Sequence, residues 1–222
     1  MKSLIIFVTN HAFLGETKDP NGTYAPELTH ALKEFDEANV SYDIASIKGG
    51  ESPLYGTDID SDETNKSYLA DPKFQEKIKH TIKAEDVDAS TYDGVFYPGG
   101  FGLLTDLASN PIVAKITAEI FQRNKPVGSV CHGPGALLPI VLDNGESILE
   151  NKTVTGFTRE EEVDFGSIDA IPYLLEESLT RKAGKYVKIK PWGEHVICDG
   201  NLITGQNPAS AAAVGKEIIK RL

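Results

Sequence analysis

The chain has 222 residues, of which 40% are hydrophobic, and carries a net charge of -11 at pH 7. This length favours a single domain spanning residues 1–222, with enough chain to bury a sizeable core. An acidic surface repels nucleic acid and anionic lipid, so neither is expected as a partner. The N-terminal apolar run, residues 4–8, is too short for a secretory signal or a membrane span. The two cysteines form no C-x-x-C pair, so we expect a cytoplasmic protein with neither a disulfide framework nor a structural metal site.

The first part of the chain alternates predicted strands and helices. Residues 4–8 form a continuous apolar run, as in a fully buried strand. Pro26 can occupy the first position of a helix that ends near residue 38, and residues 41–45 predict a second strand. Residues 47–91 are polar and mostly acidic, with one helix predicted near residues 72–83. We interpret them as a polar excursion within the same domain, because they lack the apolar residues for a core of their own.

The middle of the chain predicts two more strands and two helices. Residues 94–97 predict a third strand, which Pro98-Gly99-Gly100 ends abruptly. Asn110-Pro111 predicts a helix start, since Asn favours the cap position and Pro the first turn. Residues 127–130 predict a fourth buried strand, and residues 133–142 predict a helix directly after it.

The last part of the chain continues the alternation. It predicts a strand at 152–155, a helix at 171–182, and a hairpin of 196–199 and 202–204 around Gly200-Asn201. Asn207-Pro208 predicts the cap of a final helix. Strands that alternate with helices predict an α/β fold, a single-domain three-layer sandwich with a mostly parallel central sheet and helices on both faces.

The strongest local signal is the run Val127-Gly128-Ser129-Val130-Cys131-His132-Gly133-Pro134-Gly135. A strand of small residues leads into a cysteine and then into glycines that open a helix, which is the pattern of a nucleophile elbow. Such a turn exposes Cys131 at the carboxyl end of its strand, where open α/β sheets bind ligands, and Gly128 and Gly133 leave room for it. A helix N-terminus there is expected to lower the thiol pKa. The alternative interpretation is a buried structural cysteine.

Neighbouring residues can assist this nucleophile. His132 can act as a general base and proton shuttle, or it can be a core histidine bonded to backbone. The backbone N–H groups of Gly99 and Gly100, together with that of His132, can form an oxyanion hole, although Pro-Gly-Gly is also a common turn.

The acidic candidate residues can also be explained without a catalytic role. Glu27 lies at a helix N-terminus, where an acid commonly serves the helix dipole. Glu160-Glu161-Glu162 is typical of a solvated charge run. His30 follows Glu27 by three residues, but two ligands without a third do not indicate a metal site.

Six short motifs, spread over nearly the whole chain, carry a family resemblance. They are Tyr24-Ala25-Pro26-Glu27, Ser46-Ile47-Lys48-Gly49-Gly50, Phe96-Tyr97-Pro98-Gly99-Gly100, Val130-Cys131-His132-Gly133-Pro134, Val154-Thr155-Gly156-Phe157-Thr158 and Thr204-Gly205-Gln206-Asn207-Pro208-Ala209-Ser210. Together they resemble the ThiJ/PfpI superfamily, which has the class I glutamine amidotransferase-like fold. Within it, the chain is most similar to the branch of glutathione-independent glyoxalases (glyoxalase III), which includes stress chaperones described as protein deglycases.

The resemblance implies a role for each candidate. Cys131 would be the nucleophile, His132 its partner, and Glu27 the acid that hydrogen-bonds the thiol. A further acid lies shortly after the Gly-Phe-Thr motif in this branch, and Glu162 fits that spacing, with Glu161 as its rival. Dimers are common in the superfamily, so a homodimer is compatible with the resemblance.

The implied activity is conversion of methylglyoxal, a small α-oxoaldehyde, to lactate without glutathione, by a cysteine-dependent lyase with a stress-protective role. Cys131 would form a hemithioacetal and then a thioester, and no cofactor would be needed. Two alternatives stay open. One is a cysteine hydrolase, a peptidase or protein deglycase, that uses the same elbow. The other is a non-enzymatic holdase chaperone or thiol redox sensor.

Overall fold

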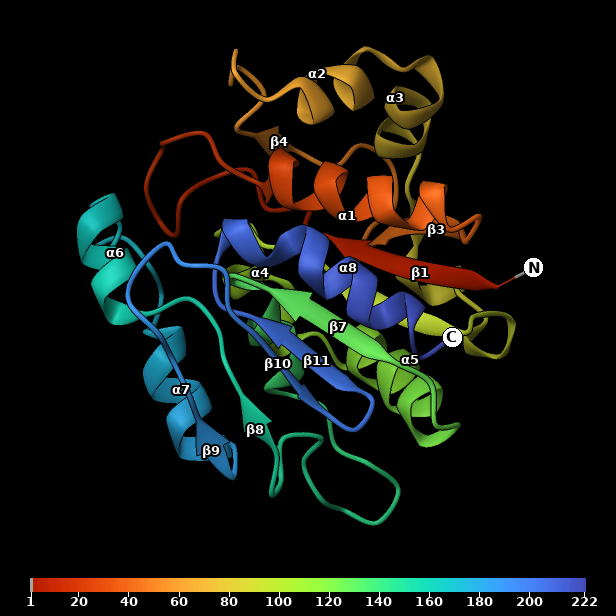
Figure 1. The fold of residues 1–222 in the computed structure, drawn as a ribbon, viewed down its shortest axis with the longest axis vertical. Helices are drawn as coiled ribbons and strands as arrows, with labels where there is room; N and C mark the ends of the chain where they lie inside the picture. The colour runs from red at the N-terminus through yellow and green to blue at the C-terminus, as the bar shows by residue number, and fades with distance from the viewer. Residues whose placement is uncertain (1) are drawn as a thin grey trace.

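The computed structural model describes residues 2–222, and its centre is a seven-stranded sheet in the order β10-β11-β7-β6-β1-β3-β5 (Figure 1). The strands are β1 (Ser3–Val8), β2 (Thr23–Tyr24), β3 (Ser41–Ser46), β4 (Leu54–Tyr55), β5 (Ile82–Lys83), β6 (Gly94–Tyr97), β7 (Val127–Val130), β8 (Thr153–Val154), β9 (Lys185–Tyr186), β10 (Val196–Asp199) and β11 (Leu202–Gly205). The helices are α1 (Ala25–Glu37), α2 (Glu63–Ala70), α3 (Pro72–Lys79), α4 (Gly102–Thr105), α5 (Pro111–Gln122), α6 (Arg159–Phe165), α7 (Leu175–Lys182) and α8 (Ala211–Ile219). Every neighbouring pair in the main sheet is parallel except β10 and β11, which form the predicted antiparallel hairpin.

Successive side chains of β6 show how the sheet divides the core. The Phe96 ring meets the Phe35 ring of α1 edge-on, with centroids 5.8 Å apart. The next residue, Tyr97, hydrogen-bonds Thr117 of α5. Because successive side chains of a strand point to opposite faces, α1 and α5 cover opposite faces of the sheet. Helix α8 packs beside α1 (Figure 1), and the expected three-layer sandwich with a mostly parallel sheet is confirmed.

The predicted strands follow their apolar runs closely. Leu4 to Val8 are fully buried because β1 lies between β3 and β6 and is covered on both faces. The strands predicted at 94–97 and 127–130 have those bounds in the structure. Asn110 caps α5 as expected, accepting hydrogen bonds from the N–H groups of Ile112 and Val113.

Three predicted elements are shorter than expected. The helix predicted at 133–142 is wrong, since only a 3₁₀ helix, Gly133–Leu137, follows β7. Two glycines and a proline supply little helix propensity there. The strand predicted at 152–155 is reduced to β8, which pairs with β9 outside the main sheet. The helix predicted at 171–182 begins only at Leu175, since Pro172 disfavours helical backbone in the residue before it.

The predicted cap of the last helix is also wrong. Asn207 does not cap a helix, because its side-chain amide donates instead to Glu161 and to the Gly193 carbonyl, both at 2.8 Å. A 3₁₀ turn, Pro208–Ser210, leads into α8. The Asn-Pro pattern predicts a local cap, whereas Asn207 bonds Glu161, which lies 46 positions away in the chain.

The polar excursion, residues 47–91, is tied to the sandwich at several points. Its strand β5 pairs with β3 at the edge of the main sheet. Its helix α2 was not predicted. Asp62 precedes this helix and caps it, and the Asp62 carboxylate also contacts His30 of α1 at 2.9 Å. His30 therefore contacts Asp62 and does not form a pair of metal ligands with Glu27. Within residues 2–222, no helix combines the length and apolar character needed to cross a membrane.

Close packing of α8 on β7 generates the first testable prediction. A Cβ added at Gly128 would lie 2.3 Å from Ile218 Cδ1 and 3.2 Å from Val214 Cγ1, so this glycine makes room for α8. Gly128→Ala is expected to lower the free energy of unfolding by about 1–3 kcal/mol through overpacking. Gly215→Ala within α8 is the control, because its nearest neighbours are at least 3.3 Å away and alanine favours helix. Urea denaturation measures both, and unchanged stability in Gly128→Ala would contradict the packing described.

Candidate active site

Cys131 stands on a sharp turn at the carboxyl end of β7. Its φ is 60°, a left-handed conformation that costs a non-glycine residue about 1–3 kcal/mol. The surrounding backbone holds this turn, since the Cys131 N–H donates to the Gly205 carbonyl and the Cys131 carbonyl accepts from the Phe157 N–H, both at 3.0 Å. Gly133 is required here, because a Cβ would lie 2.6 Å from the Tyr97 carbonyl oxygen. The arrangement is a nucleophile elbow, although the thiol is buried and only 3% of Cys131 is exposed.

His132 connects the thiol to a buried carboxylate. Its Nδ1 lies 3.4 Å from Cys131 Sγ, and its Nε2 lies 2.8 Å from Glu162 Oε1. Because a carboxylate only accepts hydrogen bonds, the network assigns the ring hydrogen to Nε2 and leaves the Nδ1 lone pair facing the thiol. Rings of Phe101 and Phe157 lie 4.3 and 4.5 Å from the imidazole and fix its plane. A ring nitrogen that can accept a proton therefore faces the Cys131 thiol.

The two candidate carboxylates have different partners. Glu162 accepts from His132 and, through its other oxygen, from the Ser167 hydroxyl. Glu161 instead accepts from the Trp192 N–H at 2.9 Å and from the side-chain amides of Gln206 and Asn207. Of the two rivals, Glu162 is the one that contacts His132.

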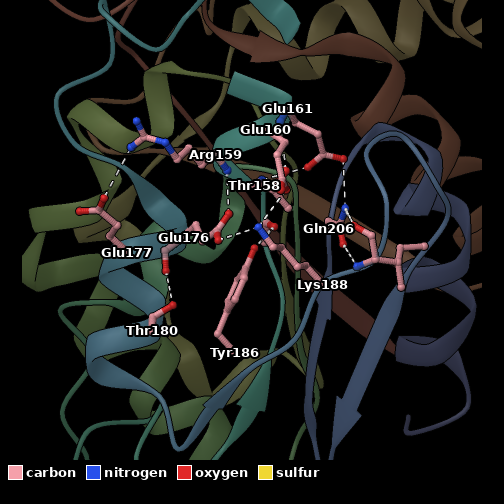
Figure 2. Close-up of polar contacts among 12 residues, drawn as sticks. Thr158, Arg159, Glu160, Glu161, Glu176, Glu177, Thr180, Tyr186, Lys188 and Gln206 are labelled. Carbon is pink, nitrogen blue, oxygen red and sulfur yellow. Dashed lines mark hydrogen bonds and ion pairs between the residues drawn. The ribbon is translucent and has the colours of Figure 1, made fainter. Parts of the chain in front are cut away.

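The expectation of a solvated charge run at 160–162 is wrong for two of its three acids. Only Glu160 is exposed, and it pairs with Lys188, as does Glu176, whereas Glu161 points away toward Gln206 (Figure 2). Glu161 completes a capping box with Thr158, which starts α6. The signal that could have identified it is the Thr-x-x-Glu spacing of Thr158 and Glu161.

Glu27 lies in the first turn of α1 and is fully buried beside Cys131. Gly99 permits this contact, since a Cβ there would lie 2.0 Å from Glu27 Oε2 and 2.6 Å from Cys131 Cβ. Neither carboxylate oxygen completes a hydrogen bond of normal geometry with any residue from 2 to 222. The side chain therefore faces the thiol and does not serve as a solvated acid for the helix dipole.

Burial sets the protonation of this pair. It raises the pKa of Glu27 to about 8, and the neighbouring thiol and the Gly99 N–H offset only part of that rise. Burial also raises the pKa of the Cys131 thiol well above its usual value, and the carboxylates of Glu27, Glu162 and Glu161 raise it further. The expectation that a helix N-terminus lowers the thiol pKa is therefore wrong, because a five-residue 3₁₀ helix cannot outweigh burial among acids. At neutral pH, Glu27 holds a proton.

Two backbone amides remain available beside the thiol. Gly100 has a φ of 122°, and a Cβ there would lie 2.2 Å from the Gly22 carbonyl oxygen, so only glycine fits. The N–H groups of Gly100 and His132 donate no hydrogen bond to an acceptor within residues 2–222. The Gly99 carbonyl accepts from the Tyr24 N–H at 3.0 Å, which fixes the turn. Free N–H groups on a fixed turn are the donors that a developing oxyanion requires.

The thiol and the imidazole open into a small cavity of about 60 Å³. Its lining is almost entirely aromatic and comprises Tyr24, Tyr55, Phe101, Cys131, His132, Phe157, Phe165, Trp192 and Pro208. Since one water needs roughly 10–15 Å³ of such space, the cavity suits a molecule of about five non-hydrogen atoms. No local pattern in the sequence predicts the aromatic walls, because these residues come from segments that lie far apart in the chain.

The raised pKa of Glu27 predicts a pH dependence. Between its ordinary pKa of 4.5 and the raised value of about 8, the folded chain binds more protons than the unfolded chain. The free energy of unfolding therefore falls as pH rises through this window. Glu27→Gln removes this titration, so its stability relative to wild type should rise by roughly 2–5 kcal/mol from pH 5 to pH 8. Urea denaturation across this range tests it, with the exposed Glu160→Gln as control; parallel pH profiles for wild type and Glu27→Gln would refute the assignment.

Comparisons with known proteins agree with this architecture. The model of the DJ-1/PfpI family matches residues 21–221. Glyoxalase 3 of Candida albicans is 25% identical over 225 residues, covering 95% of this chain and 93% of that protein. Glutathione-independent glyoxalase HSP31 of Saccharomyces cerevisiae is 30% identical over 213 residues, covering 90% of this chain and 89% of that protein.

Solved structures extend the likeness to the whole fold. The Rapid Encystment Protein 24 kDa of Francisella tularensis has a TM-score of 0.95 at 33% identity, covering 100% of this chain and 99% of that one. Glyoxalase III from Candida albicans shares the fold, with a TM-score of 0.91 at 22% identity over 100% of this chain and 97% of that one. The resemblance drawn from the six motifs is confirmed, and the chain belongs to the DJ-1/PfpI family.

Proposed function

We propose that the protein is a glutathione-independent glyoxalase that converts methylglyoxal to lactate through a covalent bond to Cys131. The observation that carries the proposal is a cavity of about 60 Å³ in which the thiol, the imidazole and free backbone N–H groups meet. Relatives named as glutathione-independent glyoxalases, at 25% and 30% identity, support it. The substrate class is a small α-oxoaldehyde.

The first step follows from the protonation of the site. Because the thiol is neutral, it loses its proton to His132 Nδ1 as sulfur bonds to the aldehyde carbon. The product is a hemithioacetal, whose oxygen the N–H groups of Gly100 and His132 can stabilise. Protonated Glu27 keeps the pair from holding two negative charges while the thiolate character develops.

The second step is an internal redox reaction. His132 passes the thiol proton to the hemithioacetal oxygen and is then free to remove the proton from the former aldehyde carbon. This gives an enediolate, which His132 then protonates on the neighbouring carbon. The aldehyde carbon is oxidised and the ketone carbon is reduced, which leaves a lactoyl thioester on Cys131. Water hydrolyses the thioester to lactate and the free thiol. Electrons balance within the substrate, so the reaction needs no external oxidant or reductant.

The alternatives are less well supported. A cavity for about five non-hydrogen atoms is too small for a peptide side chain with its backbone, which argues against a peptidase. A raised thiol pKa and 3% exposure argue against a redox sensor, since oxidation follows thiolate character and access. A location in the cytoplasm is part of the proposal, because two free cysteines fit a reducing compartment. A homodimer is also part of the proposal, and light scattering can test it by measuring the molar mass in solution.

Removal of the nucleophile tests the proposal directly. Purified Cys131→Ala should neither consume methylglyoxal nor form lactate without glutathione, because no other buried thiol is available within residues 2–222. Cys198→Ser, which changes the exposed thiol, should retain wild-type activity and serves as the matched control. Chiral analysis should find one lactate enantiomer, since an enclosed enediolate is protonated from one face. Turnover by Cys131→Ala at the wild-type rate would exclude this function.

The carboxylate that orients His132 gives a second test. Glu162→Gln is expected to lower kcat by about 10²–10⁴, the usual contribution of a general base, because Glu162 fixes the orientation of His132. Glu160→Gln, the exposed neighbour, should leave kcat unchanged. Steady-state kinetics with methylglyoxal separate the two, and equal kcat values for both variants would remove Glu162 from the mechanism.

A further inference from the structure

Two aromatic side chains are the most exposed of those that line the Cys131 cavity. Among the rings that line it, Phe165 of α6 is 53% exposed and Trp192 is 44% exposed. The deeper walls, Phe101 and Phe157, are at most 3% exposed. A side chain that both lines a cavity and meets solvent stands between the cavity and the solvent. These two rings therefore form the most exposed part of the cavity rim.

Trp192 adopts a conformation that a bulky residue seldom takes. Its φ is 63°, in the left-handed region that strongly favours glycine. Residues held in such conformations persist only where the surrounding structure fixes them, and they gather at ligand sites. The strain at Trp192, the single tryptophan of the chain, is thus an independent indication that its position serves the site.

Helix α6 holds Trp192 at two points. The backbone N–H donates to Glu161 Oε1 at 2.9 Å, and the indole Nε1–H donates to Asp164 Oδ2 at 3.2 Å. Inside the cavity, the indole meets Phe157 edge-on, with centroids 5.7 Å apart, and Phe157 in turn contacts the His132 ring. The Trp192 backbone is therefore anchored to α6, and its indole forms one wall of the cavity.

We propose that Trp192 determines the size of the substrate, and that Glu161 is the positioning residue that holds it there. This inference deepens the proposed function, on which it rests for the identity of the substrate. A methyl substituent on the α-oxoaldehyde fits within the cavity, whereas a phenyl substituent collides with the indole. Apolar, aromatic walls would otherwise favour an aryl group, so size is the property that excludes it.

Thiol labelling tests the size limit without requiring turnover. A Cys198→Ser background leaves Cys131 as the sole thiol, since the chain has two cysteines. The rates of alkylation by iodoacetamide and by the bulkier N-phenylmaleimide are measured in this background, in Trp192→Ala and in Trp192→Phe. Ile189→Ala is the matched control, because Ile189 lies on the same segment and is 38% exposed but does not line the cavity.

The ratio of the N-phenylmaleimide rate to the iodoacetamide rate should rise about tenfold or more in Trp192→Ala, the factor that a small steric misfit produces in a close-fitting pocket. It should rise less in Trp192→Phe and stay constant in Ile189→Ala. An unchanged ratio in Trp192→Ala, or an equal rise in Ile189→Ala, would overturn the proposal. If Trp192→Ala does not fold, Trp192→Phe decides alone, and an unchanged ratio there overturns it.

Substrate kinetics then separate this inference from the proposed function. The ratio of kcat/KM for phenylglyoxal to that for methylglyoxal should rise in Trp192→Ala, and Glu161→Gln should raise it in the same direction. If wild type converts neither compound, the glyoxalase proposal fails while the labelling ratio still decides the role of Trp192. If wild type prefers phenylglyoxal, the size limit fails while the glyoxalase proposal stands.

Discussion

The site depends on one electrostatic constraint, which is that Cys131 and Glu27 are buried together in a place that resists a second negative charge. Burial raises the pKa of both groups, and the Glu27 carboxylate raises that of the thiol further, whereas the hydrogen bond from the thiol offsets only part of the rise at Glu27. At neutral pH the pair therefore retains protons until a substrate arrives. This favours a mechanism in which the thiol is deprotonated as it attacks, with His132 as the acceptor, over one with a standing thiolate.

Residues from three separate elements of the fold make this contact. Glu27 comes from α1, Gly99 follows β6, and Cys131 follows β7. Three elements that are distant in sequence therefore meet at the carboxyl ends of two central strands. A side chain at Gly99 would occupy the space that the acid and the thiol share. Helix α6 contributes twice, with Glu162 orienting His132 and Glu161 holding the segment that carries Trp192. Glu161 and Glu162, which are adjacent in sequence, thus connect the same helix to Trp192 in the cavity wall and to His132 beside the thiol.

Much of this was predictable from sequence, and the failures have physical causes. Continuous apolar runs identified the central strands, because a strand covered on both faces has no polar side. The elbow predicted Cys131 as the nucleophile and the family motifs added His132, Glu27 and Glu162, four residues that the fold brings together. The thiol pKa was mispredicted because it depends on long-range burial and on acids from α1 and α6, which no local pattern reveals. Glu161 could not be distinguished from Glu162 because consecutive residues of a helix point in different directions, and only the orientation of α6 decides which one meets His132. Trp192 carried no signal, since its strain and its anchors arise only in the folded chain.

The covalent intermediate is the central claim, and mass spectrometry of an acid-quenched reaction tests it most directly. During turnover of methylglyoxal, the peptide that contains Cys131 should carry one equivalent of the substrate, as hemithioacetal or as its isomer, the lactoyl thioester. That adduct should disappear when the substrate is exhausted, while the peptide that contains Cys198 stays unmodified. Lactate formation with an unmodified Cys131 peptide, quenched at several times under saturating substrate, would contradict the account.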